Sequence, residues 1–212
     1  MSGAEAIRAV CEAVGMQEPP GWGAFFDVVQ SWDARTDLTS ARTDTELAEI
    51  LFLDAAQVIG AAWLEPSASL VDIGAGVGAP TIPLLLSDET LRATLVEPRR
   101  IRTAFLRTAA GGLGIARRAT MLEQKVDPAK PVVEGAPFNI ALSRATFSPE
   151  EWLPIGAELA EEVWVLTAGT DVEAPGDLRL DRRLDYEVPS SGASRSILAY
   201  RQKRGQTPFS KG

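Results

Sequence analysis

The feature that most constrains this fold is a glycine-rich turn, VDIGAGVGAP, at residues 71–80. It follows a short apolar run, SLVDI, that is typical of a buried strand, and it leads into an apolar segment near residues 81–87 that favours a helix. Glycine stands at every second position of the turn, at Gly74, Gly76 and Gly78. Because glycine has no side chain, such a turn lets the backbone approach a ligand closely. The segment therefore predicts a ligand-binding loop between a strand and a helix.

Strand and helix patterns alternate along the chain after this loop. Short apolar runs predict four more strands, at residues 92–97, 119–123, 138–143 and 162–168. Helical spacing predicts helices at residues 99–110, closed by Gly111 and Gly112, and at residues 149–161. This alternation predicts an α/β fold with a parallel sheet that helices cover on both faces. Two last strands, at residues 178–188 and 194–203, flank the turn sequence PSSGAS and predict a C-terminal antiparallel hairpin.

The chain before the glycine-rich loop carries only helical patterns. Apolar spacing predicts helices at residues 4–14 and 22–32. Thr43-Asp-Thr-Glu46 has the sequence of a capping box, which predicts the start of a third helix running to about Trp63. The apolar stripes of these helices include tryptophans, so we expect most of the five tryptophans of the chain in the core.

The same patterns divide the chain into three parts. We expect a helical cap at residues 1–66 and a ligand-binding α/β domain at residues 67–204. The polar and basic end of the chain, residues 205–212, is expected to be a flexible tail.

Composition excludes several kinds of chemistry. The 212 residues include no histidine and one cysteine, Cys11. A Ser-His-Asp triad, a Cys-His pair and a histidine-ligated metal site are thereby excluded, and we expect no metal. The sequence has no apolar run of about 18 residues and no signal-peptide pattern, which predicts a cytoplasmic protein without a membrane span. We also expect a monomer.

The formal net charge of −8 argues against a protein that coats long stretches of nucleic acid, because such proteins are basic. A local basic patch remains compatible with this charge. Arg99, Arg100 and Arg102 lie together at the start of a predicted helix. A second basic group lies near the C-terminus and comprises Arg182, Arg183, Arg195, Arg201, Lys203 and Arg204. Each group is either a contact surface for RNA phosphates or part of the solvated surface.

Two kinds of ligand are compatible with the glycine-rich loop. Taken as Gly-x-Gly-x-x-Ala, from Gly74 to Ala79, it is a variant of the dinucleotide fingerprint, with Glu97 about 20 residues on to bind a ribose. Taken as acid-x-Gly-x-Gly-x-Gly, from Asp72 to Gly78, it is the signature of class I S-adenosylmethionine-dependent methyltransferases. The Asp72 carboxylate favours the second interpretation, because it would repel a pyrophosphate and attract a positively charged sulfonium.

Four longer segments resemble one family. They are WDARTDLTSARTDTELAEILFLDA, LVDIGAGVGAPTIPLLL, LVEPRRIRTAFLRTAA and FNIALSRA. From about Trp32 to Gly169, their order and spacing are similar to those of the bacterial small-subunit rRNA guanine-N7 methyltransferases of the glucose-inhibited-division protein B type. The resemblance implies a Rossmann-like class I methyltransferase sheet with an N-terminal helical cap. It also implies methyl transfer from S-adenosylmethionine to N7 of one guanine in 16S rRNA, with the 30S subunit or its RNA as partner.

The resemblance also implies roles for individual residues. Glu97 would hold the ribose of the cofactor, Val126 and Asp127 would flank the adenine, and Arg144 would reach the mouth of the active site as the catalytic residue. The full expected set of cofactor-binding residues is Asp72, Gly74, Gly76, Gly78, Ala79, Glu97, Val126, Asp127 and Arg144.

Several positions depart from the family pattern, mostly on the expected substrate side. No histidine precedes Leu53-Asp54, and the family's lysine is absent from Thr167-Ala168-Gly169. The remaining departures are Arg195-Ser196 in place of Arg-His, Thr81 in place of glycine, and Thr146 within the family's Arg-Ala-Phe. These departures keep two alternatives open: a methyltransferase that acts on a small molecule, and a non-catalytic relative that binds the cofactor or nothing.

The expected reaction is compatible with a chain that lacks histidine. N7 of guanine carries a free lone pair and no proton, so its methylation requires alignment with the methyl donor and no general base. Arg144 follows a predicted strand, and its guanidinium is placed to bind guanine O6 or a phosphate. The alternative role for Arg144 is a salt bridge with a neighbouring acidic residue.

Overall fold

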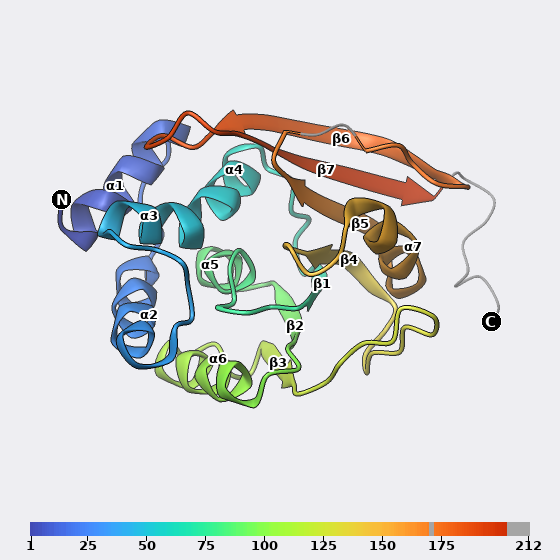
Figure 1. The fold of residues 1–212 in the computed structure, drawn as a ribbon, viewed down its shortest axis with the longest axis horizontal. Helices are drawn as coiled ribbons and strands as arrows, with labels where there is room; N and C mark the ends of the chain where they lie inside the picture. The colour runs from blue at the N-terminus through green and yellow to red at the C-terminus, as the bar shows by residue number, and fades with distance from the viewer. Residues whose placement is uncertain (170–171, 203–212) are drawn as a thin grey trace.

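The computed structural model describes residues 1–169 and 172–202, and within them the strands form a single seven-stranded sheet (Figure 1). The strand order is β3-β2-β1-β4-β5-β7-β6. The first five strands are parallel, and β7 runs antiparallel to both β5 and β6. The strands are β1 (Ser69–Ile73), β2 (Arg92–Val96), β3 (Ala119–Leu122), β4 (Phe138–Ser143), β5 (Ala160–Thr167), β6 (Leu178–Glu187) and β7 (Ser194–Gln202).

The strand order reverses direction between β1 and β4. The chain passes from β1 outward to β2 and β3, then returns to place β4 on the other side of β1. In open α/β sheets, ligands bind in the crevice at the carboxyl ends of the strands where the order reverses. The glycine-rich loop that follows β1 therefore lies at the position where this topology opens a binding site.

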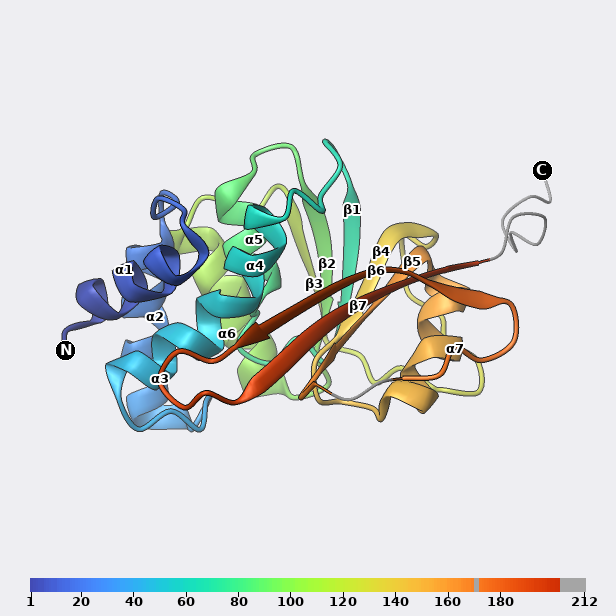
Figure 2. The same cartoon turned by 90° about the horizontal axis from the view of Figure 1, so that it is seen from above.

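Helices cover both faces of the sheet. Figure 2 shows the cap helices together with α5 and α6 on one face, and α7 on the other. The helical segments are α1 (Gly3–Val14), α2 (Trp22–Thr36), α3 (Asp44–Ala48), the π-helical turn η1 (Glu49–Leu53), α4 (Asp54–Gly60), α5 (Thr81–Ser87), α6 (Arg100–Gly112) and α7 (Pro149–Leu159). Successive residues of β1 enter different cores, since Leu70 packs on the cap side and Val71 on the α7 side. The predicted parallel sheet with two covered faces is confirmed.

The cap shares its hydrophobic core with the sheet. The Trp22 ring stacks on Phe52 at 4.6 Å between centroids, and its indole N–H donates to the Pro83 carbonyl of α5 at 3.2 Å. Trp32 of α2 meets Phe105 of α6 edge to face. The expectation of core tryptophans holds for Trp22, Trp152 and Trp164, which are fully buried.

The third predicted helix of the cap differs from the prediction. A single helix was expected up to about Trp63, whereas α3 gives way to the π-helical turn η1, and α4 ends at Gly60. The Thr43 hydroxyl accepts from the Glu46 N–H as predicted, but the Glu46 carboxylate accepts from the Arg42 N–H at 2.6 Å, so the capping box is incomplete. Single π-helical turns occur frequently at functional sites, and this one borders the cavity described below.

Other boundaries shift by one to four residues, the largest shift being at the end of α2, which runs to Thr36. Helix α6 runs through Gly111 and Gly112, where the prediction ended it before them. Helix α7 ends at Leu159, because β5 already begins at Ala160. These shifts leave the element order unchanged.

The predicted C-terminal hairpin is confirmed, with β6 and β7 paired from Leu178–Gln202 to Glu187–Ser194. In Figure 2 the turn between them lies beside α3. The expected tail at residues 205–212 lies outside the described residues. In the part of the chain that the structure describes, none of the helices has both the length and the apolar character needed to cross a bilayer.

Candidate active site

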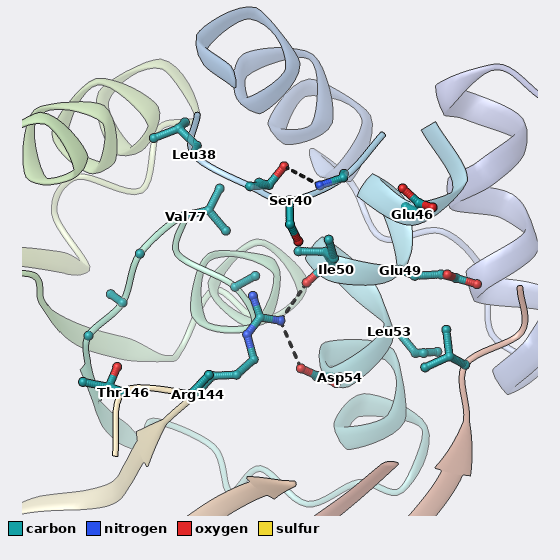
Figure 3. A pocket seen from close by; sticks show the side chains of 18 of the residues that line it. Leu38, Ser40, Glu46, Glu49, Ile50, Leu53, Asp54, Val77, Arg144 and Thr146 are labelled. Carbon is teal, nitrogen blue, oxygen red and sulfur yellow. Dashed lines mark hydrogen bonds and ion pairs between the residues drawn. The ribbon is translucent and has the colours of Figure 1, made fainter. Parts of the chain in front are cut away.

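A cavity of about 990 Å³ opens at the carboxyl ends of the parallel strands. This volume is at the upper end of the roughly 300–1,000 Å³ that ligand pockets occupy. Its lining comes from the loop between α2 and α3 with α3 itself, the η1 turn with the start of α4, the glycine-rich loop, the residues after β2 with the first turn of α6, the residues after β4, and the β6–β7 turn with the start of β7. Figure 3 shows side chains from these segments converging on one space.

The glycines of the loop are required for different reasons. Gly74 has φ +77°, and a Cβ there would collide with the Thr146 side chain that follows β4. Gly76 has φ +57°, and a Cβ there would meet no atom nearer than the Arg102 guanidinium at 3.7 Å. A side chain at position 76 would therefore occupy the cavity, whereas one at position 74 would displace a neighbouring segment. Gly78 faces away from the cavity, against Ile82.

Glu97 lies directly after β2 and is 3% exposed. Its Oε2 accepts from the Gly76 N–H at 3.0 Å, and its Oε1 accepts from the Arg99 N–H at 2.9 Å. Two backbone donors thus orient the carboxylate at the cavity wall. Each oxygen of an ionised carboxylate has a second lone pair, so Glu97 retains acceptor capacity for a pair of ligand hydroxyls.

Asp72 lies beneath the loop, 1% exposed, and is not among the residues that line the cavity. Its Oδ2 accepts from the Thr81 hydroxyl at 2.6 Å, which ties β1 to the start of α5. Burial raises the pKa of the Asp72 carboxyl to about 7, against the opposing effect of the Thr81 hydrogen bond. The structure therefore gives Asp72 a supporting position under the loop, where the sequence analysis expected a charge beside the ligand. The hydroxyl of Thr81 supplies its partner.

Val126 and Asp127 lie outside the cavity lining of the described residues. Val126 is 5% exposed and packs in the core on the α7 side of the sheet. Asp127 is exposed, and its carboxylate accepts from the Ala129 N–H at 3.0 Å. Ala79, in contrast, lines the cavity as expected.

Arg144 forms the salt bridge that was one of its two expected roles. It lines the cavity after β4, and its Nη1 donates to the Ile50 carbonyl at 2.8 Å and pairs with Asp54 Oδ2 at 3.2 Å. Figure 3 shows the guanidinium in the middle of the cavity, with Ile50 and Asp54 on one side and Val77 and Thr146 on the other. One nitrogen is thus fixed by the cap, and the rest of the guanidinium remains a donor toward the cavity.

Asp54 is itself held by a residue that sequence reasoning missed. The Tyr186 hydroxyl of β6 donates to Asp54 Oδ1 at 2.6 Å. Burial and the adjacent Asp54 carboxylate raise the pKa of the Tyr186 hydroxyl, so it remains a neutral donor. Nearby, the Glu49 carboxylate accepts from the Ser190 N–H at 2.8 Å and from its hydroxyl at 2.6 Å. No local sequence signal links these pairs, because the partners are more than 130 residues apart.

The structure separates the arginines that were expected to face RNA. Arg99, Arg102 and Arg195 line the cavity, whereas Arg100 does not. Three of the four described members of the C-terminal group pair with acidic residues: Arg182 and Arg201 with Glu162, and Arg183 with Asp185. Lys203 and Arg204 lie outside the described residues. Within this C-terminal group, three arginines of the hairpin thus form ion pairs, whereas Arg195 lines the cavity.

Comparison with known proteins gives a consistent match. A family model described as GidB, rRNA small subunit methyltransferase G, matches residues 22–169. A ribosomal RNA small subunit methyltransferase G from Anaeromyxobacter dehalogenans (strain 2CP-1) is 27% identical, over 94% of this chain and 97% of the relative. The protein of the same name from Myxococcus xanthus is 29% identical, over 92% of this chain and 94% of the relative.

Solved structures agree on the fold. An S-adenosylmethionine-dependent methyltransferase from Aquifex aeolicus superposes with a TM-score of 0.53 at 14% identity, over 82% of this chain and 97% of that chain. At this identity the similarity shows the class I methyltransferase fold alone. It leaves the acceptor to be argued from the family and the site.

Proposed function

This chain belongs to the GidB family of rRNA small subunit methyltransferases, and from that premise we propose that it methylates N7 of a guanine in 16S rRNA with S-adenosylmethionine as cofactor. The observation that carries the proposal is the match over residues 22–169, which covers both the cap and the glycine-rich loop that together border the cavity. The glycine-rich loop alone is compatible with a dinucleotide or with S-adenosylmethionine, and family membership favours S-adenosylmethionine.

The cofactor half of the cavity fits S-adenosylmethionine. Gly76 leaves space that a Cβ would fill, and Glu97 offers oriented acceptors for the two hydroxyls of a ribose. We therefore assign cofactor binding to Gly74, Gly76, Ala79 and Glu97, with Asp72 and Gly78 shaping the loop from behind. Roles for Val126 and Asp127 beside the adenine remain predictions. When bound, the cofactor supplies an electrophilic methyl group on a positively charged sulfonium.

The acceptor half of the cavity suits an atom that needs no general base. The carboxylates there are already engaged, with Glu49 bound to Ser190 and Asp54 bound to Tyr186 and Arg144. Guanine N7 has a lone pair and no proton to lose, so alignment is the main requirement. The residues of this half thus support N7 as the acceptor.

We assign Arg144 the task of holding guanine by O6. Arginine usually reads guanine through O6 and N7 together, but a hydrogen bond to N7 would occupy the lone pair that must react. Because Nη1 is bound to Ile50 and Asp54, Arg144 has fewer donors left to offer. A single hydrogen bond to O6 would orient the base and leave N7 exposed. Arg144 acts in this way as a catalytic residue that touches the substrate.

The finer biological setting follows from the substrate. We propose that the protein acts as a monomer in the cytoplasm, on the 30S subunit or its RNA. Size-exclusion chromatography with light scattering on the purified protein, alone and mixed with 30S subunits, checks the oligomeric state. A stable dimer in solution would contradict the monomer.

The test of function is transfer of a labelled methyl group from S-adenosylmethionine to 30S subunits that lack endogenous modification. We expect incorporation with the wild-type protein and its loss in Glu97→Ala, with micromolar binding of S-adenosylhomocysteine by the wild type and none of NAD. Cofactor binding without transfer to ribosomal RNA would favour the small-molecule alternative. Absence of cofactor binding would favour a non-catalytic relative.

A further inference from the structure

The charge of the cavity lining differs from that of the whole protein. The chain has a formal net charge of −8. The lining contains five arginines and four acidic residues, namely Arg42, Arg99, Arg102, Arg144, Arg195, Glu46, Glu49, Asp54 and Glu97. The cavity is thus a region of slight positive charge in an acidic protein, which is a pattern that favours an anionic ligand.

The acidic residues of the lining do not neutralise these arginines. Glu46 accepts from a backbone N–H, Glu49 from the N–H and hydroxyl of Ser190, and Glu97 from two backbone N–H groups. The one ion pair inside the lining of the described residues joins Asp54 to Arg144. Most of these carboxylates thus accept from neutral donors, and four of the five lining guanidinium groups have no ion pair within the described residues.

Four of the five arginines that line the cavity have no acidic partner among the described residues: Arg42, Arg99, Arg102 and Arg195. They come from separate segments, namely the α2–α3 loop, the N-cap and first turn of α6, and the first residues of β7. The other arginines of the hairpin behave differently, since Arg179, Arg182, Arg183 and Arg201 each pair with a carboxylate. Among the described arginines of the hairpin, Arg195 is the one without an acidic partner, and it is also the one that lines the cavity.

The positions of Arg99 and Arg102 are also unfavourable for the helix that carries them. The N-terminus of a helix carries partial positive charge and favours acidic residues. Helix α6 has no acidic residue in its first turn and instead begins with arginine. The Glu97 carboxylate already lies at this end of the helix, where it accepts from the Arg99 N–H, and a bound anion would compensate the two arginine charges further.

We propose that Arg42, Arg99, Arg102 and Arg195 bind the phosphodiester groups of the RNA strand on either side of the target nucleotide. The inference rests on the proposed function and adds the residues that hold the RNA backbone. Guanidinium groups suit this task because they form paired hydrogen bonds with phosphate oxygens. The phosphate contacts position the strand, and Arg144 deeper in the cavity contacts the base. The paired arginines of the hairpin take no part in RNA binding.

The experiment measures the salt dependence of RNA binding. The KM for unmodified 30S subunits is determined over a range of salt concentrations for wild type, Arg42→Gln, Arg195→Gln and the double variant. Each phosphate contact on a single strand contributes about 0.7 to the slope of log affinity against log salt. We expect each single variant to lower the slope by about 0.7 and the double variant by about 1.4.

Matched controls separate phosphate contacts from general charge effects. Arg183→Gln removes the same charge from a residue paired with Asp185, and we expect the wild-type slope. Arg195→Lys keeps the charge and should restore most of the slope. Binding of S-adenosylhomocysteine and thermal unfolding, measured on every variant, report whether the cofactor site and the fold are intact.

The outcomes distinguish this inference from the proposed function. Wild-type methylation of 30S subunits with parallel salt slopes for all variants overturns the phosphate site and leaves the function standing. An equal slope change in Arg183→Gln and Arg195→Gln would overturn it as well, because the effect would then follow net charge. No methylation by the wild type would instead remove the proposed function itself.

Discussion

At the scale of single residues, the cofactor site depends on what its glycines face. Gly74 and Gly76 both have positive φ, at +77° and +57°, but their surroundings differ. Thr146 fills the space at position 74, and the cavity lies at position 76. Gly74 is therefore required for packing against Thr146, and Gly76 is required for the space of the cavity. Alanine substitutions at the two positions separate these two effects.

Gly74→Ala is expected to lower the free energy of unfolding by about 2–5 kcal/mol, from left-handed backbone strain plus overpacking against Thr146. Gly76→Ala should lower the free energy of unfolding only by the backbone strain, about 1–2 kcal/mol. Relative to the stability that each variant loses, Gly76→Ala should weaken S-adenosylhomocysteine binding more than Gly74→Ala does. Denaturant unfolding and calorimetric titration measure both quantities. Thr146→Gly should recover part of the stability in the Gly74→Ala background, and full additivity of the two substitutions would contradict the predicted collision.

Asp72 is expected to make stability depend on pH. Burial raises the pKa of its carboxyl from the ordinary 3.8 to about 7. Between these values the folded state keeps a proton that the unfolded chain releases. The contribution of Asp72 to stability is thus fully present below the unfolded pKa and is lost as the pH rises to about 7.

The variant that tests this is Asp72→Asn, which keeps an acceptor for Thr81 and cannot ionise. Its stability should match wild type near about pH 4 and exceed it near about pH 8, since each pKa unit is worth about 1.4 kcal/mol. Urea unfolding across that range gives both curves. Parallel curves would show that Asp72 ionises at its ordinary pKa.

At the scale of elements, the C-terminal hairpin completes the substrate side of the cavity. Strand β6 carries Tyr186 to Asp54 at the start of α4, and the β6–β7 turn carries Ser190 to Glu49 in η1. Asp54 in turn holds Arg144. The hairpin therefore acts on the reaction through the cap, and Tyr186 is a positioning residue.

Tyr186→Phe removes the hydroxyl and leaves the ring. A hydrogen bond to a charged group contributes about 1.5–3 kcal/mol. Without it Asp54 and Arg144 lose part of their orientation, so we expect kcat/KM for 30S subunits to fall roughly tenfold. Binding of S-adenosylhomocysteine should not change. Steady-state kinetics and calorimetry provide the two readouts.

The matched control is Tyr200→Phe, which removes the chain's other tyrosine hydroxyl. That hydroxyl donates to the Val172 carbonyl at 2.7 Å, away from the cavity lining. We expect a loss of stability without a kinetic effect. Equal kinetic losses in both variants would argue that Tyr186 has only a structural role.

The same elements show what the sequence predicts and what it does not. The strands and the glycine-rich loop are local patterns of apolar and glycine residues, and the structure confirms them. The π-helical turn η1 was missed because its residues, Glu49–Leu53, include no glycine or proline that would mark a break in the helix. The Asp54–Tyr186 pair spans 132 residues, so only the folded topology brings it together. Similarly, the burial of Asp72 follows from the packing of α5 against β1 and leaves no trace in the motif.

At the scale of the whole molecule, an acidic protein concentrates uncompensated arginines at one opening. The net charge of −8 argues against a surface that coats nucleic acid, and four of the described hairpin arginines, Arg179, Arg182, Arg183 and Arg201, pair with carboxylates. The cavity that joins the glycine-rich loop to the cap and the hairpin is where cofactor and acceptor would meet. Its lining supports an account in which orientation, without a general base, drives methyl transfer.

The most direct test of this account identifies the methylated nucleoside. Unmodified 30S subunits are incubated with the protein and S-adenosylmethionine, and nuclease digests of the 16S rRNA are analysed by mass spectrometry. The account predicts N7-methylguanosine at one position with the wild type, loss of it in Glu97→Ala, and strong reduction in Arg144→Ala with cofactor binding retained. Methylation at another atom or another base, or none with an intact cofactor site, would contradict it.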